Sequence, residues 1–162
     1  MKFDYRSKLP PKLQDPIHLL AFGFGSGLAP KAPGTFGTLA AIPFFLILSL
    51  LPLWLYLIVV LAACTYGVHL CGKTADDMGV HDDPSIVWDE FAGFWITMIA
   101  IPVSFTTIVL GFVLFRIFDI LKPWPIDWID RNVSGGLGIM VDDIVAGLMA
   151  LGCLHLINYF LL

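Results

Sequence analysis

Two pairs of adjacent carboxylates are the residues of this sequence best suited to chemistry. Asp89 and Glu90 lie inside the apolar run "SIVWDEFAGFW", and Asp142 and Asp143 lie inside "GGLGIMVDDIVAG". A carboxylate in apolar surroundings is costly unless it is paired, protonated or bound to a cation. Because hard cations such as Mg²⁺ prefer oxygen ligands, we interpret the four side chains as candidate metal ligands. The alternatives are a structural salt bridge for the first pair and helix-start charge for the second.

Cationic side chains that could bind an oxyanion lie in two other segments. Arg116, Asp119 and Lys122 are spaced i, i+3, i+6, so they share one face at the end of an apolar helix. The glycine-rich stretch "GFGSGLAPKAPGTFGTLAA" contains Lys31 and precedes another apolar segment. Its glycines let backbone N–H groups approach an anion, and a helix N-terminus favours negative charge. It lacks the Gly-Lys-Ser/Thr of a P-loop, so a flexible loop packed against helices is the alternative.

Composition indicates a membrane protein of a single domain, residues 1–162. Hydrophobic residues make up 58% of the chain and charged residues 14%, and the mean hydropathy is +0.86. Soluble proteins carry about 25% charged residues. A net charge of −4 without a Lys/Arg cluster excludes a nucleic-acid partner. Residues 1–15 are polar and lack the apolar region of a secretory signal peptide, and we expect them to be a cytosolic segment.

The elements that must position the acids and cations are predicted to be helices. Five apolar segments are evident: Leu39–Leu51, Leu53–Leu70, Phe91–Pro102, Phe105–Phe115 and Ile144–Leu162. Pro52 and Pro102 interrupt the two long apolar regions, which predicts helical hairpins over Leu39–Leu70 and Phe91–Phe115. The alternative for Phe91–Phe115 is one kinked span. The predicted fold is therefore an all-α integral membrane bundle of about five hydrophobic helices, some of them short.

The positions of the charges favour the hairpins. All 9 Lys/Arg and all 13 Asp/Glu residues lie outside the two predicted turns. With hairpins, the N-terminal region, the loop before Glu90 and the segment Arg116–Asp143 share one side of the membrane. The positive-inside rule makes that side the cytoplasm.

Three local features complete the expected arrangement. Ser85 follows Pro84 as a helix start, which places Asp89 and Glu90 in the second turn of that helix. Asp142 and Asp143 are expected to open the last span. The segment Pro16–Gly25 is expected to lie at the membrane interface.

These residues together indicate phosphate chemistry at a membrane surface. Carboxylates for Mg²⁺ beside Lys and Arg for oxyanions are the groups that phosphoryl hydrolysis uses. A lipid phosphate is the substrate found at that depth.

The same segments closely resemble a known family. "GFGSGLAPKAPGTFGTLAA", "DMGVHDDPSIVWDEFAGFWIT" and "FRIFDILKPWPIDWIDRNVSGGLGIMVDDIVAG" are similar to bacterial phosphatidylglycerophosphatase A, over about Ile17 to Gly147. The resemblance implies an all-helical, Mg²⁺-dependent phosphatase of the bacterial inner (cytoplasmic) membrane. It would convert phosphatidylglycerol phosphate to phosphatidylglycerol and inorganic phosphate. The distribution of charges places the active site on the cytosolic side, and no obligatory protein partner is evident.

Roles follow for individual residues under this hypothesis. Asp89, Glu90, Asp142 and Asp143 would hold one or two Mg²⁺ ions that neutralise the phosphate and activate water. Asp119 would orient the neighbouring cations. The phosphoryl oxygens would be bound by residues of the glycine-rich segment and of the third segment: Ser26, Gly27, Lys31, Gly34, Thr35, Thr38, Arg116 and Lys122.

Other readings remain open from the sequence. Attack by an aspartate to form an aspartyl-phosphate is the second mechanism, although no Asp-x-Asp nucleophile motif is present. A small membrane transporter or ion-pathway protein could also use intramembrane acids, although the predicted spans are almost entirely apolar at mid-depth. A lipid phosphotransferase is a third class, but the long Asp-rich motif of the CDP-alcohol transferases is absent.

Overall fold

The structure, a computed structural model, describes residues 12–162, and it contains helices and no strand within that range. The helices occur in this order: α1 (Pro16–Ala21), η2 (Gly23–Leu28), α2 (Pro33–Leu48), α3 (Leu53–Met78), α4 (Trp88–Thr97), α5 (Phe105–Leu121), α6 (Ile126–Asn132) and α7 (Gly135–Leu161). The all-α prediction is confirmed. Most of the predicted polar segment 1–15 lies outside the described residues.

Both predicted helical hairpins are present. Residues 49–52 connect α2 to α3, and residues 98–104 connect α4 to α5. Ser104 begins α5 with a capping box, in which its Oγ accepts the Thr107 backbone N–H at 3.1 Å and its own N–H donates to Thr107 Oγ1 at 3.0 Å. A single kinked span over Phe91–Phe115 is therefore wrong, because residues 98–104 leave the helix.

Several predicted helix boundaries are wrong because helices continue past their apolar stretches. Helix α2 begins at Pro33, α3 continues to Met78, and α7 begins at Gly135. Asp142 and Asp143 consequently lie about two turns inside α7 rather than at its start. In α3 the polar end is stabilised by an i, i+4 ion pair, Lys73 Nζ to Asp77 Oδ2 at 2.8 Å.

The start of α4 also differs from the prediction. It begins at Trp88 instead of Ser85, so Asp89 and Glu90 lie in its first turn. Ser85 does not start the helix because its backbone N–H and its hydroxyl both bind the Asp83 carboxylate, which folds a local turn. The Val87 N–H then donates to the carbonyl of Ala21, the last residue of α1, at 2.8 Å, so Val87 is tied to α1 and not to a turn of α4.

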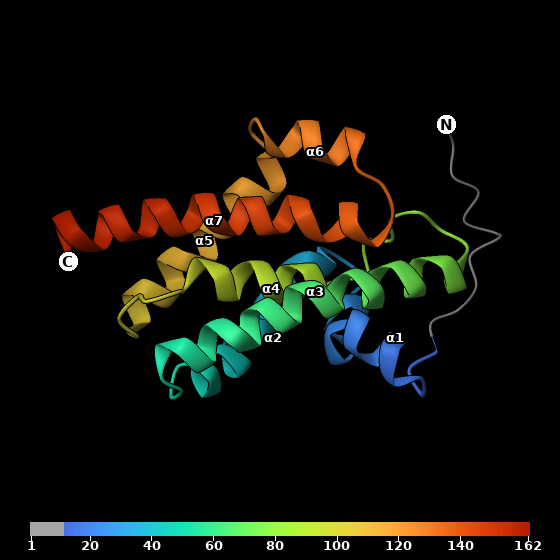
Figure 1. The fold of residues 1–162 in the computed structure, drawn as a ribbon, viewed down its shortest axis with the longest axis horizontal. Helices are drawn as coiled ribbons and strands as arrows, with labels where there is room; N and C mark the ends of the chain where they lie inside the picture. The colour runs from blue at the N-terminus through green and yellow to red at the C-terminus, as the bar shows by residue number, and fades with distance from the viewer. Residues whose placement is uncertain (1–11) are drawn as a thin grey trace.

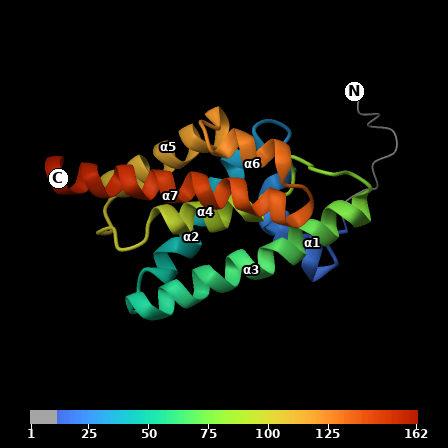
Figure 2. The ribbon, with the colours of Figure 1, turned by 45° about the horizontal axis from the view of Figure 1, so that its top comes forward.

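Helix α4 is the centre of the molecule. Figures 1 and 2 show it enclosed by α2, α3, α5 and α7. Its two tryptophans bind neighbouring backbones, with Trp88 Nε1 donating to the Ala63 carbonyl at 3.0 Å and Trp95 Nε1 to the Ala41 carbonyl at 3.1 Å. A polar helix start is thereby held among apolar neighbours.

The segment expected at the membrane interface, Pro16–Gly25, forms α1 and the start of η2. Helix α1 packs against α3, where the buried His18 places Nε2 3.0 Å from Asp77 Oδ2. This contact fixes one side of the segment on the protein.

Two glycines bring α4 and α7 unusually close. A Cβ on Gly147 would lie 2.5 Å from the Gly93 carbonyl oxygen, and a Cβ on Gly93 would lie 3.0 Å from the Asp143 carbonyl oxygen. Asp89 precedes Gly93 by four residues and Asp143 precedes Gly147 by four residues, so each acid lies on the face that makes the contact. The glycine contact therefore positions the two acids near each other.

The turns of the two hairpins, residues 49–52 and 98–104, lie at the same end of the molecule as the C-terminus. Helix α1 and the loop before α4 lie towards the other end (Figure 1). Helices α3 and α7 are long and apolar enough to cross a membrane. Large apolar side chains are exposed on several helices, among them Ile47, Leu61, Phe105 and Ile120. An apolar surface of this extent indicates association with a membrane.

Candidate active site

Three carboxylates from two helices converge beside the glycine contact. One oxygen each of Asp89, Glu90 and Asp143 lie within 4.8 Å of one another. Asp89 and Glu90 are neighbours in the first turn of α4, and Asp143 is in α7. The prediction that the two acidic pairs meet is confirmed for these three side chains.

Each of the three acids has an oxygen that the protein does not satisfy. Asp89 Oδ1, Glu90 Oε2 and Asp143 Oδ2 are buried without a hydrogen-bond partner. Asp143 is only 2% exposed. Buried polar atoms are nearly always paired, and three unpaired carboxyl oxygens in one place fit a ligand that supplies positive charge.

Asp142 does not join this group of three. Its Oδ2 lies 2.6 Å from Lys122 Nζ, which also lies 2.9 Å from Asp130 Oδ1. Partial burial of Lys122 opposes its charge, but the two carboxylates outweigh burial and raise the pKa of the ammonium above its ordinary value. The metal-ligand role of Asp142 stays a prediction.

Arg116 lies beside Glu90. Its Nη1 is 3.8 Å from Glu90 Oε1 and pairs closely with Asp119 Oδ2, one turn further along α5. Arg116 Nε is buried without a partner. The guanidinium of Arg116 thus has an N–H donor without a partner beside the three acids.

The start of α2 approaches the same place. A Cβ on Gly34 would lie 2.5 Å from Glu90 Oε1 and 3.1 Å from Arg116 Nη1, so any side chain at this position would displace these two charged groups. Ala32, just before the helix, has the left-handed backbone (φ 48°) that L-residues rarely adopt. The N-terminal end of α2, whose dipole favours anions, faces the acids and Arg116.

All these groups line one cavity of about 350 Å³. Its polar walls are Asp82, Asp83, Asp89, Glu90, Arg116, Asp119, Lys122, Asp142 and Asp143. Asp82 and Asp83 were assigned no catalytic role from the sequence. The available signal was an acidic pair before Pro84, at the start of the turn that leads into α4.

The remaining predicted phosphate-binding residues lie elsewhere. Lys31 is exposed, Ser26 donates to the Gly23 carbonyl at 2.8 Å, and Thr38 donates to the Gly34 carbonyl at 2.9 Å. A Cβ on Gly27 would overlap the Ser85 carbonyl, so this glycine permits close packing. Thr35 is half-buried next to Gly34. The structure therefore brings Gly34, Arg116 and Lys122 to the cavity, and the binding roles of the other five stay predictions.

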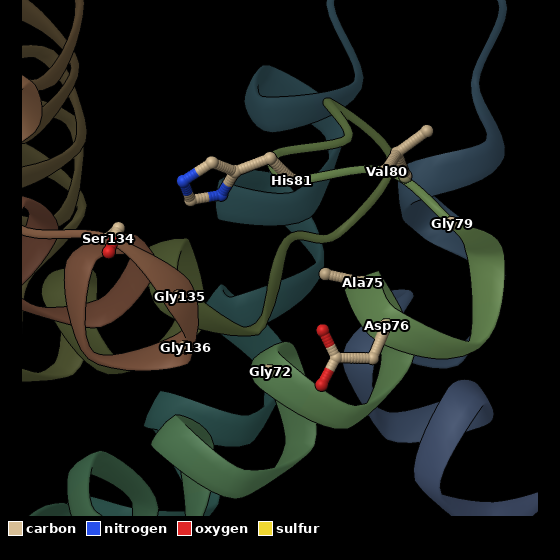
Figure 3. Close-up of a pocket in the computed structure, with 9 residues that line it drawn as sticks. All are labelled: Gly72, Ala75, Asp76, Gly79, Val80, His81, Ser134, Gly135 and Gly136. Carbon is tan, nitrogen blue, oxygen red and sulfur yellow. The ribbon is translucent and has the colours of Figure 1, made fainter.

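A second hollow, of about 440 Å³, lies between the end of α3 and the start of α7 (Figure 3). Its walls include Gly72, Gly135 and Gly136, with Asp76 and His81 as the ionisable groups. The three converging acids do not line it. We therefore place the chemistry in the carboxylate cavity.

Comparison with known proteins decides the family. The family model described as Phosphatidylglycerophosphatase A matches residues 19–158, which include the whole carboxylate cavity. The chain belongs to this phosphatidylglycerophosphatase A family.

Individual relatives agree with this assignment. The Phosphatidylglycerophosphatase A of Escherichia coli (strain K12) is 57% identical over 149 residues, which are 91% of this chain and 87% of the relative. The protein of the same name from Haemophilus influenzae is 50% identical over 152 residues, or 93% of each chain. A Bacteroides thetaiotaomicron protein, provisionally named a phosphatidylinositol-3-phosphatase, is 39% identical over 138 residues, covering 80% and 85%.

No solved structure matches the chain. Membership of the phosphatidylglycerophosphatase A family confirms the resemblance that the three sequence segments indicated, and it makes the chain a phosphatase.

Proposed function

We propose that this chain hydrolyses phosphatidylglycerol phosphate to phosphatidylglycerol and inorganic phosphate, with Mg²⁺ as cofactor. The names of the two most similar relatives given above support the substrate. The reaction adds water across the terminal phosphate ester, so that the bond from phosphorus to the glycerol oxygen breaks. It would belong to phospholipid biosynthesis.

The residues of the cavity fit a hard divalent cation. Three carboxylates offer oxygen ligands within 4.8 Å of one another, and each has a buried oxygen without a partner. Oxygen donors without His or Cys suit Mg²⁺ better than zinc. When bound, Mg²⁺ supplies positive charge for the phosphoryl oxygens and makes a water nucleophile available at neutral pH.

Arg116 and the start of α2 would bind the phosphoryl oxygens. Arg116 offers a planar set of donors, of which Nε has no partner in the protein. Gly34 lets the start of α2 approach Arg116 and Glu90 closely, so the positive end of the α2 dipole would face an oxyanion bound there. These donors would stabilise charge as it develops in the transition state.

Two further residues act through their neighbours. Asp119 pairs with Arg116 and fixes the direction of the guanidinium, which makes it a positioning residue. Lys122 joins Asp142 in α7 to Asp130 near the end of α6. We infer that Lys122 holds these helices together and keeps a cation at the cavity wall.

The membrane arrangement is part of the proposal. We infer a multi-pass protein of the bacterial inner membrane. The cavity would lie on the cytosolic side, and the turns of both hairpins would lie on the opposite side of the membrane. This rests on two helices long enough to span and on the turns lying together at one end. A lipid headgroup at the membrane surface then lies at the depth of the cavity.

The convergence of Asp89, Glu90 and Asp143, each with an unpaired buried oxygen, carries the proposal. The test is phosphate release by purified protein from dioleoyl phosphatidylglycerol phosphate in detergent micelles. We expect release with Mg²⁺, loss with EDTA, and recovery when Mg²⁺ is added in excess. No phosphate release under any of these conditions would overturn the activity, and full activity in EDTA would overturn the cofactor.

A further inference from the structure

The carboxylate cavity reaches the exposed apolar surface of the protein at one residue. Ile120 is the cavity-lining residue with a large, strongly exposed apolar side chain, at 63% exposure, whereas Ile86 and Ile139 in the same walls are buried. Ile120 follows Arg116 by four residues on α5, so the apolar opening and the guanidinium lie on adjacent turns of one helix. The start of α2, at Pro33, lines the same cavity.

An apolar track leads along α5 to this opening. Val109, Val113, Ile117 and Ile120 are exposed by 42%, 44%, 44% and 63%, and their spacing of four, four and three residues places them on one face. From Val109 to Ile120 the track is about 17 Å long at 1.5 Å per residue. One leaflet's hydrocarbon layer is about 15 Å deep, half of the core of a bilayer.

A different hollow, which we call the acidic hollow, adjoins the cavity. It has a volume of about 550 Å³, and it shares Asp82, Ile139 and Asp142 with the cavity while adding His81 and Asp130. Water can therefore approach the cavity without passing Ile120. The apolar opening at Ile120 is left for a hydrophobic ligand.

We propose that the substrate reaches the carboxylates sideways from the bilayer, with one acyl chain of a diacyl lipid lying along the α5 track. The headgroup passes Ile120 into the cavity, where Arg116 meets its phosphate. The occupant is an acyl chain rather than a protein partner because the track ends at an anion-binding cavity and is as long as one leaflet is deep. The inference rests on the proposed phosphatase activity.

The experiment compares two substrates that share one headgroup. Phosphate release is measured from dioleoyl and from water-soluble dihexanoyl phosphatidylglycerol phosphate, for the double variant Ile117→Asn/Ile120→Asn. The matched control is Ile58→Asn/Leu61→Asn on α3, whose side chains have the same spacing and are 55% and 65% exposed. A second variant, Ile120→Trp, keeps the surface apolar but narrows the opening.

We expect the α5 double variant to lose about tenfold or more in kcat/KM for the dioleoyl substrate and to stay within about twofold for the dihexanoyl substrate. Ile120→Trp should show the same selective loss, and the α3 control should leave the ratio of the two substrates unchanged. Equal losses on both substrates, an equal loss of ratio in the α3 control, or wild-type dioleoyl turnover in Ile120→Trp would each overturn the lateral path. Absence of phosphate release from both substrates in the wild type would instead overturn the proposed function.

Discussion

Gly34 is the residue where adding a single methyl group should lower activity without lowering stability. A Cβ there would lie 2.5 Å from Glu90 Oε1 and 3.1 Å from Arg116 Nη1, within the space assigned to the phosphate. We expect Gly34→Ala to lower kcat/KM for phosphate release by about ten- to a hundredfold, because it displaces both charged groups. Thermal unfolding in detergent should change little.

The matched control is Gly152→Ala in α7, where a Cβ meets no atom within 4 Å. Its activity should equal that of the wild type. Wild-type activity in Gly34→Ala would remove the start of α2 from the phosphate site.

The acids show how far the sequence could predict the site. Asp89, Glu90 and Asp143 were predictable because carboxylates in apolar runs need compensation. Asp142 has the same sequence signal, yet its side chain pairs with Lys122 at 2.6 Å. Adjacent residues of a helix point about 100° apart, and only the packing of α7 against α4 and α5 decides which of the two faces Asp89 and Glu90.

At the scale of elements, the contact of Gly93 with Gly147 holds the acid-bearing helices together. We expect Gly147→Ala to destabilise the protein by about 1–3 kcal/mol, because its Cβ would lie 2.5 Å from the Gly93 carbonyl oxygen. Phosphate release should fall with it, since α4 and α7 would separate and Asp89 would move away from Asp143. Differential scanning calorimetry of the purified protein measures the change in stability.

Gly152→Ala serves here as well, because it changes the same helix at an open position. Helix propensity predicts that it is neutral or stabilising by up to about 1 kcal/mol. A Gly147→Ala protein as stable and active as the wild type would contradict the positioning role of the contact.

Helix existence and pairing were more predictable than helix ends. Pro52 and Pro102 correctly marked both hairpins, since each lies in a non-helical connection or at its border. The ends were missed because polar residues extend the helices, as Lys73 and Asp77 do in α3. The start of α4 depended on the bond of Ser85 to Asp83, which propensity does not report.

At the scale of the whole molecule, the two turns and the cavity should face opposite sides of the membrane. Leu50 and Phe105 lie at the turns and are each 84% exposed, while the exposed His81 borders the acidic hollow at the other end. In a variant without its three cysteines, single cysteines at these positions can be labelled by a membrane-impermeant maleimide on spheroplasts. We expect labelling of Leu50→Cys and Phe105→Cys in intact spheroplasts, and of His81→Cys only after permeabilisation. Labelling of all three in intact spheroplasts would contradict the arrangement.

We propose that Asp89, Glu90 and Asp143 together hold a divalent cation, and a direct measurement of metal binding distinguishes this role from a purely structural one. Mn²⁺ can replace Mg²⁺ at oxygen sites, and its binding to purified protein is followed by electron paramagnetic resonance. We predict one or two bound Mn²⁺ ions that excess Mg²⁺ displaces, with binding lost in Asp89→Asn and Asp143→Asn and retained in Asp76→Asn, which changes an exposed acid outside the cavity. Wild-type Mn²⁺ binding in both cavity variants would show that these carboxylates do not hold the cation.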